Sequence, residues 1–219
     1  MFDAIAPSYD LNNRIHSMWR DQAWRREAVR VAQVTAASVV LDVACGTGDL
    51  AMAFRKGGAN RVIGIDFVES MLHLADDKRR RDEAITYQAG DATALPLADA
   101  SVDVVSIAFG IRNVHRPQRA VAEFHRVLKP GGRLIILEFS QPANPLLRRL
   151  YQFYSGVIMP RTASWIARDR SNAYRYLPRS VDTFLDRDAM CRLISDAGFG
   201  GVTIKPLTMG VAVIYRGVK

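Results

Sequence analysis

Short apolar runs alternate with amphipathic stretches from about position 38 to the end of the chain. Seven such runs occur, at 39–43, 61–65, 84–88, 102–109, 133–139, 201–206 and 210–217. The inner runs are almost continuously apolar and rich in Val and Ile, which is typical of strands that are covered on both faces. We therefore predict an α/β fold built on a mostly parallel, seven-stranded sheet.

The stretches between the runs have a helical period. Apolar residues recur at i, i+3, i+4 and i+7 in two of them, with charged residues on the opposite face. These two sets are Val68, Met71, Leu72, Ala75 and Met190, Leu193, Ile194, Ala197. In "LKPGGR" (128–133), Pro and Gly end a helix before the next strand, and Gly198 follows the last apolar turn of another. This alternation predicts a doubly wound sheet with helices on both faces.

Two regions lie outside the alternation. Residues 1–37 are predicted to form two helices, the second over 18–34, and 140–185 form an aromatic, arginine-rich insertion after the fifth strand. The remaining parts are a core over 38–139 and a final helix with two strands over 186–219. Ligands of open α/β sheets bind beyond the carboxyl ends of the strands. We expect both added regions to act as helical lids on a single domain, 1–219.

Composition narrows the functional classes. The chain has 219 residues, 49% of them hydrophobic, and a net charge of +8. No run is long enough to span a membrane, no secretory signal is recognisable, and two cysteines give neither a disulfide framework nor a metal-ligand pattern. We expect a cytoplasmic protein without a metal. Seven arginines and one acid lie between 144 and 180, so this segment could meet nucleic acid, anionic lipid or an acidic substrate.

The stretch "LDVACGTGDLA" (41–51) contains a glycine turn of the form G-x-G-x-x-A. Asp66 ends the second strand twenty positions after Gly46, a spacing that also fits a dinucleotide site. Asp42 and Asp49 place further negative charge near the turn, where pyrophosphate would be repelled. Asp91, after the third strand, could bind an adenine edge. These acids favour S-adenosylmethionine, which is cationic and lacks phosphate, although helix capping is an alternative role for them.

Longer motifs carry a resemblance that covers almost the whole chain. They are "FDAIAPSYDLNNRIHSMWRDQAWRR", "GIDFVESML", "GDATALPLADASVDVVSIAFGIRNV", "RVLKPGGRLIILEFS" and "YSGVIMPRTASWIARDRSNAYRYLPRSV". With them the chain resembles class I methyltransferases, and more narrowly the quinone C-methyltransferases of ubiquinone and menaquinone biosynthesis. The resemblance implies a Rossmann-like fold, S-adenosylmethionine as cofactor, and a reduced polyprenyl quinol as substrate.

The resemblance assigns cofactor contacts to Thr47, Asp66, Asp91 and Ala92. The full set of cofactor-binding residues that we predict is Asp42, Gly46, Thr47, Gly48, Asp66, Phe67, Asp91, Ala92 and Phe109. Two positions depart from the family pattern. Ala108 stands where a serine is common, which removes one hydroxyl contact, and Cys45 replaces a glycine of the turn.

Methyl transfer to a ring carbon needs a nearby hydroxyl to lose its proton, so a base or a stabilising cation is useful. In "FGIRNV", Arg112 could hold the phenolate or orient a water, and Asn113 could bind a ring oxygen; we predict both as catalytic. His16 and His115 are candidates for the base, which the sequence does not identify. The predicted substrate-binding residues are Tyr9, Asp10, His16, Tyr154, Tyr174 and Tyr176.

We expect an enzyme that converts demethylmenaquinol to menaquinol or methylates a 2-polyprenyl-6-methoxy-1,4-benzoquinol. Aromatic and arginine side chains of the insertion suggest peripheral contact with an anionic membrane surface. A homodimer is an option, and no nucleic-acid partner is expected. Two alternatives stay open: a C-methyltransferase of a soluble aromatic natural product, and a basic methyltransferase-like module that binds nucleic acid.

Overall fold

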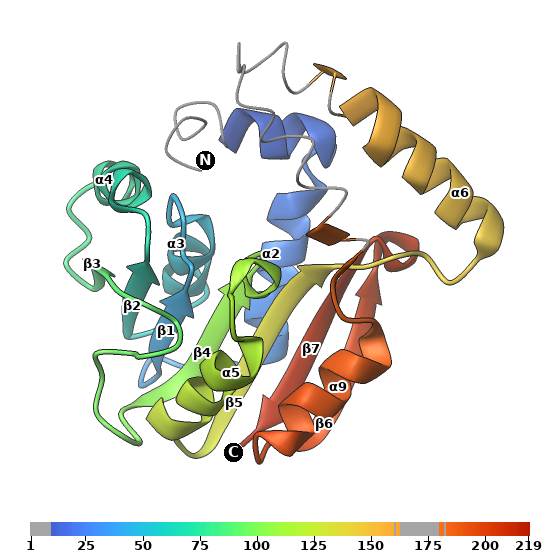
Figure 1. The fold of residues 1–219 in the computed structure, drawn as a ribbon. Coiled ribbons are helices and arrows are strands. Elements are labelled where there is room, and N and C mark those ends of the chain that lie inside the picture. The colour runs from blue at the N-terminus through green and yellow to red at the C-terminus, as the bar shows by residue number, and fades with distance from the viewer. Residues whose placement is uncertain (1–9, 160, 163–179, 182) are drawn as a thin grey trace.

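One sheet forms the centre of the protein (Figure 1). The computed structural model describes residues 10–159, 161–162, 180–181 and 183–219. The seven strands are β1 (Val39–Val43), β2 (Arg61–Asp66), β3 (Ile85–Ala89), β4 (Val102–Ala108), β5 (Leu128–Phe139), β6 (Gly200–Leu207) and β7 (Ala212–Val218). They run in the order β3-β2-β1-β4-β5-β7-β6, with β7 antiparallel to both its neighbours and the other pairs parallel. The predicted fold class is confirmed.

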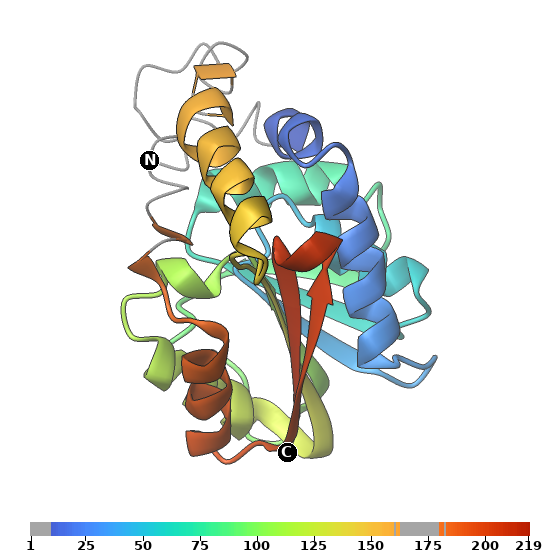
Figure 2. The ribbon, with the colours of Figure 1, turned by 90° about the vertical axis from the view of Figure 1, so that its right-hand side faces the viewer.

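Helices cover both faces of the sheet. They are α2 (Arg20–Ala32), α3 (Asp49–Lys56), α4 (Glu69–Lys78), α5 (Pro117–Val127) and α9 (Arg187–Asp196). Trp24 of α2 and Phe54 of α3 pack on one face, whereas Phe124 of α5 and Ile194 of α9 pack on the other. Figure 2 shows α2 and α9 on opposite sides of the strands. Two apolar cores hold the sheet between them, which fixes the carboxyl ends of β1, β2 and β4 as a rigid platform.

Several predicted boundaries differ from the structure, and two of these differences have a clear physical reason. The second N-terminal helix begins at Arg20 rather than at 18, because Met18 and Trp19 take left-handed φ angles of 51° and 59°. Strand β5 begins at Leu128 rather than at 133. Val102 pairs with Leu128 while Val104 pairs with Arg133, so the residues between the two partners on β5 form a bulge that stays within the strand.

Further helices lie above the carboxyl ends of the parallel strands, at the top of Figure 1. Residues 10–16 are helical, and the insertion after β5 begins with α6 (Pro145–Phe153), which continues as the π-helix η2 (Tyr154–Ile158). Asn144 caps α6 by accepting hydrogen bonds from the backbone N–H groups of Leu146 and Leu147. Among the described residues, no helix is long and apolar enough to cross a bilayer.

Candidate cofactor and acceptor site

A cavity of about 590 Å³ opens at the carboxyl ends of β1, β2 and β4. The predicted residues in its wall are Gly46, Asp66, Phe67, Asp91, Ala92, Phe109 and Asn113, with the histidine candidate His115. They come from four separate loops, and the topology of a parallel sheet brings these loops to one edge. The structure thus places most of the predicted cofactor residues and one predicted catalytic residue in one chamber.

The glycine turn connects β1 to α3 at the floor of this cavity. Gly46 and Gly48 both have positive φ angles, of 54° and 79°. A Cβ atom on Gly48 would lie 2.2 Å from the hydroxyl oxygen of Tyr87, so no other residue fits there without a shift. A Cβ atom on Gly46 would meet nothing within 4 Å. The backbone is therefore open to a ligand at Gly46 and tightly packed at Gly48.

Asp66 ties the glycine turn to the start of α4. Its Oδ2 atom accepts a hydrogen bond of 2.7 Å from the Gly46 N–H, and Oδ1 accepts one of 2.9 Å from the Val68 N–H. Burial raises the pKa of Asp66, although these backbone bonds oppose the shift. The carboxylate keeps free lone pairs toward the cavity wall, where a ribose hydroxyl could donate. The neighbouring Phe67 side chain is 82% exposed, so its ring is accessible for stacking on a planar ring of a ligand.

Asp91 occupies the turn after β3. Its Oδ1 atom accepts a 2.8 Å hydrogen bond from the Thr93 N–H, and this bond lowers the pKa of the carboxyl group. The turn-capping role that the sequence left open is therefore present. Asp91 and Ala92 nevertheless line the cavity, so their exposed edges remain available to a ligand.

Asp42 lies inside β1, below the cavity and outside its wall. The side chain accepts a 2.8 Å hydrogen bond at Oδ1 from the Ser106 hydroxyl, and its Oδ2 atom is buried with no hydrogen-bond partner among the described residues. Burial raises the pKa of Asp42 to about 7. A cationic group above the turn would lower the cost of keeping this carboxyl group ionised.

The loop after β4 forms the opposite wall. Phe109 has a φ angle of 56° and ends the strand, and its ring packs on Phe139 with 4.4 Å between centroids. The backbone oxygen of Phe109 accepts hydrogen bonds from Arg112 and from Asn113. Ala108 also lines the cavity, where a serine would present a hydroxyl. Asn113, on the short helix η1 (Ile111–Asn113), is exposed and lines the cavity, and its amide nitrogen lies 3.5 Å from the Phe109 oxygen.

Arg112 does not line the cavity. Its Nη1 atom lies 2.5 Å from Oε1 of Glu138, and the guanidinium stacks over the Phe139 ring at 5.3 Å. The sequence analysis assigned no role to Glu138, although this residue follows an apolar run of β5 and lies within the motif "RVLKPGGRLIILEFS". An acid at the carboxyl end of a central strand is the one signal that could have found it.

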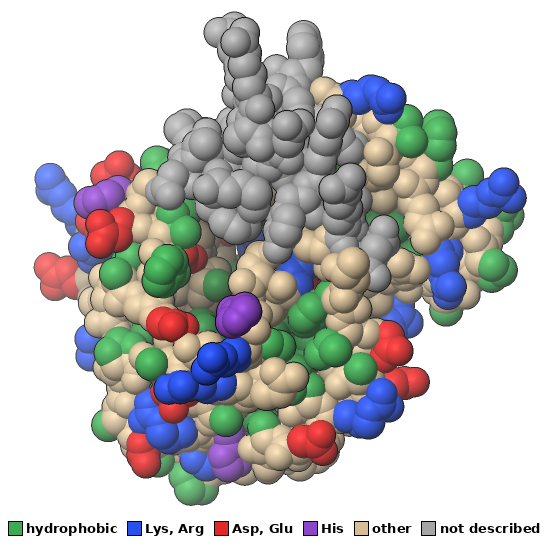
Figure 3. Space-filling model, viewed as in Figure 1, with side chains coloured by type: hydrophobic (Ala, Val, Ile, Leu, Met, Phe, Trp, Pro, Cys, Tyr) green, Lys and Arg blue, Asp and Glu red, His purple; other side chains and the backbone are tan. Residues whose placement is uncertain are grey.

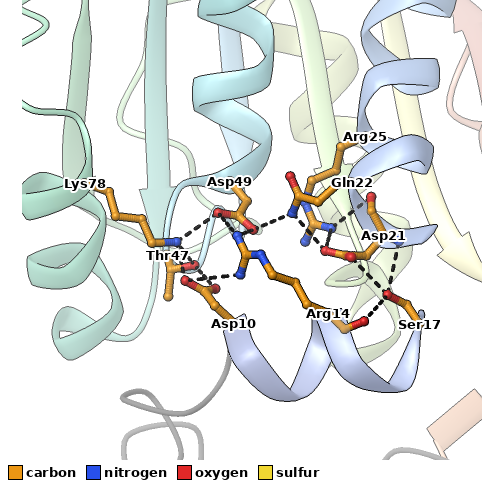
Figure 4. Close-up of polar contacts among 9 residues, drawn as sticks. All are labelled: Asp10, Arg14, Ser17, Asp21, Gln22, Arg25, Thr47, Asp49 and Lys78. Carbon is orange, nitrogen blue, oxygen red and sulfur yellow. Dashed lines mark hydrogen bonds and ion pairs between the residues drawn. The ribbon is translucent and has the colours of Figure 1, made fainter. Parts of the chain in front are cut away.

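Thr47 does not line the cavity and lies in a polar cluster that joins the N-terminal helices to the glycine turn (Figure 4). Its hydroxyl donates to Asp10 at 2.6 Å and accepts from Lys78 at 2.9 Å. Lys78 also pairs with Asp10 and Asp49, and Arg14 lies 3.1 Å from Asp49. Asp10, predicted to bind the substrate, thus contacts Thr47, which is predicted to bind the cofactor. The sequence reasoning did not identify the cations Lys78 and Arg14.

Tyr154 and His16 lie apart from the cavity wall. The Tyr154 hydroxyl donates to the backbone oxygen of His16 at 3.0 Å, and this contact joins the N-terminal helix to the insertion. Burial lowers the pKa of His16. Tyr9, Tyr174 and Tyr176 fall outside the described residues.

The chain is similar along its whole length to members of one protein family. The model of the ubiE/COQ5 methyltransferase family matches residues 1–219. A protein of Syntrophotalea carbinolica named ubiquinone/menaquinone biosynthesis C-methyltransferase UbiE is 44% identical over 100% of this chain and 92% of its own length. A demethylmenaquinone methyltransferase of Clavibacter sepedonicus is 38% identical over 100% of this chain and 89% of its own length.

Solved structures share the fold. A structure from Thermotoga maritima, described as a SAM-dependent methyltransferase and possible histamine N-methyltransferase, matches with a TM-score of 0.72 and 20% identity. It covers 100% of this chain and 97% of its own. The prediction of a Rossmann-like, S-adenosylmethionine-dependent methyltransferase is confirmed, and the chain belongs to the ubiE/COQ5 methyltransferase family.

Proposed function

We propose that this protein transfers a methyl group from S-adenosylmethionine to a ring carbon of a reduced polyprenyl quinol. The observation that carries the proposal is that one cavity at the edge of the sheet is lined by both sets of candidate residues. It joins the cofactor candidates Gly46, Asp66 and Asp91 to the acceptor candidates Asn113 and His115. Catalysis of a displacement depends chiefly on such alignment in a site that excludes water.

The residues present fit the cofactor. Gly46 leaves its backbone open, Asp66 offers carboxylate lone pairs, and Phe67 presents an exposed ring. Asp42 adds a buried carboxyl oxygen that has no hydrogen-bond partner among the described residues. When bound, S-adenosylmethionine supplies an electrophilic methyl group on a positive sulfur. The acids then stabilise that charge, while they would repel a pyrophosphate.

The acceptor side has a different chemistry. Asn113 carries an amide that can orient a ring oxygen, and the apolar Val114 and Phe109 offer surface to an aromatic ring. His115 is exposed at the cavity wall, where its imidazole can donate or accept a hydrogen bond. A hydroquinone ring is electron-rich once a hydroxyl loses its proton, whereas the oxidised quinone is not. The acceptor is therefore the reduced form.

The acceptor is tested with methyl-labelled cofactor and two short-chain substrates, a demethylmenaquinol and the benzoquinol analogue, each in reduced and oxidised form. Mass spectrometry should show one added methyl group on a reduced substrate and none on the oxidised ones. Faster turnover of a tail-free aromatic would favour a soluble natural product as substrate. Failure of every quinol, with adenosylhomocysteine bound normally, would reject the proposal.

Arg112 has a proposed role in turnover rather than in cofactor binding. Because the Arg112 side chain lies outside the cavity and pairs with Glu138, Arg112→Ala should leave the affinity for adenosylhomocysteine unchanged. It should suppress methyl transfer, because Arg112 donates a hydrogen bond to the backbone oxygen of Phe109, which lines the cavity. Weakened cofactor binding with normal turnover would contradict this role.

Helix α6 extends the proposal to a membrane surface. Leu146, Leu150 and Phe153 are 67%, 58% and 59% exposed, and their spacing of four and three residues places them on one face of the helix. Arg148 and Arg149 lie between them in sequence, and Figure 3 shows hydrophobic and basic side chains together on this side of the molecule. An apolar stripe beside cations suits an anionic bilayer that holds a polyprenyl tail.

Co-sedimentation with vesicles tests this surface. The protein should bind vesicles that contain anionic lipid and release them in high salt, and Leu150→Glu should weaken the binding. Ile204→Glu, at an exposed apolar residue of β6, is the matched control. Equal binding to neutral and anionic vesicles would reject a role for lipid charge, and absence of binding to both would reject the membrane contact. Self-association is a separate prediction, which light scattering would test.

A further inference from the structure

Helix α5 carries a polar stripe along the loop between β3 and β4. Arg119, Glu123 and Arg126 recur at i, i+4 and i+7, so they share one face of the helix. Each of them bonds to the backbone of this loop. The contacts are Arg119 Nε to the Thr93 oxygen at 2.9 Å, the Leu95 N–H to Glu123 Oε2 at 2.9 Å, and Arg126 Nη2 and Nη1 to the Leu95 and Leu97 oxygens at 3.0 and 2.8 Å. The stripe thus fixes the loop that carries Asp91 and Ala92.

Arg119 differs from the other two members of the stripe because it also lines the cavity. Glu123 and Arg126 pair with each other at 2.8 Å and lie outside the cavity wall. Nε is the one atom of Arg119 that bonds to the described residues, so the N–H groups on Nη1 and Nη2 have no partner among them. A guanidinium held at one nitrogen presents its remaining donors in a fixed plane.

Arg119 and Asp91 flank the same residue of the loop. The Thr93 N–H donates to Oδ1 of Asp91 at 2.8 Å, and the Thr93 oxygen accepts from Arg119. All three residues line the cavity. The bond from Thr93 lowers the pKa of Asp91, and the charge of Arg119 acts in the same direction. An ionised acceptor and a cationic donor are therefore present together in this part of the wall.

One edge of adenine matches this pair of groups. The 6-amino group of adenine donates hydrogen bonds, whereas the ring nitrogens N1 and N7, which flank that group, accept them. A carboxylate that accepts from the amino group and a guanidinium that donates to a flanking nitrogen would bind the same base at two points. Asp91 is already the predicted partner of the adenine edge, and Arg119 supplies the donor beside it.

We propose that Arg119 is a further cofactor-binding residue, whose guanidinium donates a hydrogen bond to N1 or N7 of adenine while Asp91 accepts from the 6-amino group. The bond to Thr93 holds the guanidinium in place before the cofactor binds, so little side-chain freedom is lost on binding. This inference rests on the cofactor site of the proposed function, with the adenine edge at Asp91, and is independent of the identity of the methyl acceptor.

Calorimetry of adenosylhomocysteine binding tests this contact. Arg119→Met keeps an unbranched stem and removes the charge and the donors, so the affinity should fall about tenfold through the loss of a charge-assisted hydrogen bond. Arg119 is exposed, so the variant should fold. Arg126→Met is the matched control for docking of the loop, because Arg126 makes two bonds to the loop away from the cavity. Arg116→Met is the control for charge, because Arg116 is exposed and lines the cavity.

Both controls should change the affinity by no more than about twofold. Deaza analogues of adenosylhomocysteine, in which N1 or N7 is replaced by C–H, then show whether the contact is direct. For one of the two analogues, the loss of affinity that the wild type shows relative to the parent compound should disappear in Arg119→Met, because the donor to that nitrogen is gone.

An equal loss of affinity in Arg119→Met and either control would overturn the inference, because loop docking or charge alone would then explain it. The same loss for each deaza analogue in Arg119→Met as in the wild type would also overturn it. Absence of adenosylhomocysteine binding by the wild type would reject the cofactor site as a whole. These measurements contain no methyl acceptor, so a failure to methylate quinols would reject the proposed function instead.

Discussion

The buried carboxyl group of Asp42 gives the sharpest prediction on stability. Asp42 is 1% exposed in the middle of the sheet, with one oxygen bonded to Ser106 and the other without a hydrogen-bond partner among the described residues. The variant Asp42→Asn keeps an oxygen that can accept from Ser106 and removes the ionisable group. We expect this variant to be more stable than the wild type at neutral and alkaline pH, and to bind the cofactor more weakly.

The magnitude follows from the pKa. Burial raises the pKa of Asp42 from 3.8 to about 7. The contribution of Asp42 to the free energy of unfolding is fully present below the pKa of the unfolded protein and is lost as pH rises through the pKa of the folded protein. Each unit of difference corresponds to about 1.4 kcal/mol. Asparagine does not titrate. The difference in free energy of unfolding between Asp42→Asn and the wild type should therefore shift by about 3 kcal/mol in favour of the variant from pH 5 to pH 8.

Urea denaturation of both proteins at pH 5 and pH 8 measures this change. Asp103→Asn is a control of opposite sign: although burial acts to raise its pKa, bonds from Val39 and Lys129 lower it overall. Because the stability that a lowered pKa contributes is complete above the unfolded value of 3.8, the difference in unfolding free energy between Asp103→Asn and the wild type should be the same at pH 5 and pH 8. Stability curves of Asp42→Asn and wild type that stay parallel over this range would refute the reasoning.

Three further variants probe the turn and its supports. Asp66→Ala should weaken adenosylhomocysteine binding at least tenfold by the loss of about 1.5–3 kcal/mol of charge-assisted hydrogen bonding; calorimetry would contradict this if the affinity matched that of the exposed control Asp76→Ala. Gly48→Ala should cost about 1–3 kcal/mol in unfolding free energy, because of its φ angle of 79° and the contact with Tyr87; an unchanged denaturation midpoint would argue against this strain. Lys78→Met breaks the ion pairs of Lys78 with Asp10 and Asp49, so proteolysis within residues 10–16 should become about tenfold faster. Equal cleavage rates in variant and wild type would show that the polar cluster around Thr47 does not hold the helix over 10–16.

The sequence was sufficient for the sheet and the cofactor edge because both depend on local signals. Apolar runs predicted the strands, and the acid that ends β2 and the acid that follows β3 come together once the strands are parallel. Asp66 and Asp91 therefore line the predicted cavity. Local capping, which the sequence could not separate from ligand binding, is present at both residues.

Long-range partners could not be predicted in the same way. Glu138 meets Arg112 across two strands, and Lys78 meets Asp10 between elements that are 68 residues apart in the chain. Such pairs depend on how helices pack on the sheet, which no local pattern encodes. The bulge of β5 was missed for a related reason, since "KPGG" is typical of a turn and only pairing with β4 shows that the strand continues.

The central claim is that a ring carbon receives the methyl group. It is tested most directly by carbon-13 NMR of the product formed from methyl-labelled S-adenosylmethionine and a reduced demethylmenaquinol. We expect a signal of a methyl group bonded to an aromatic carbon. A methoxy signal, which would place the label on oxygen, would contradict it.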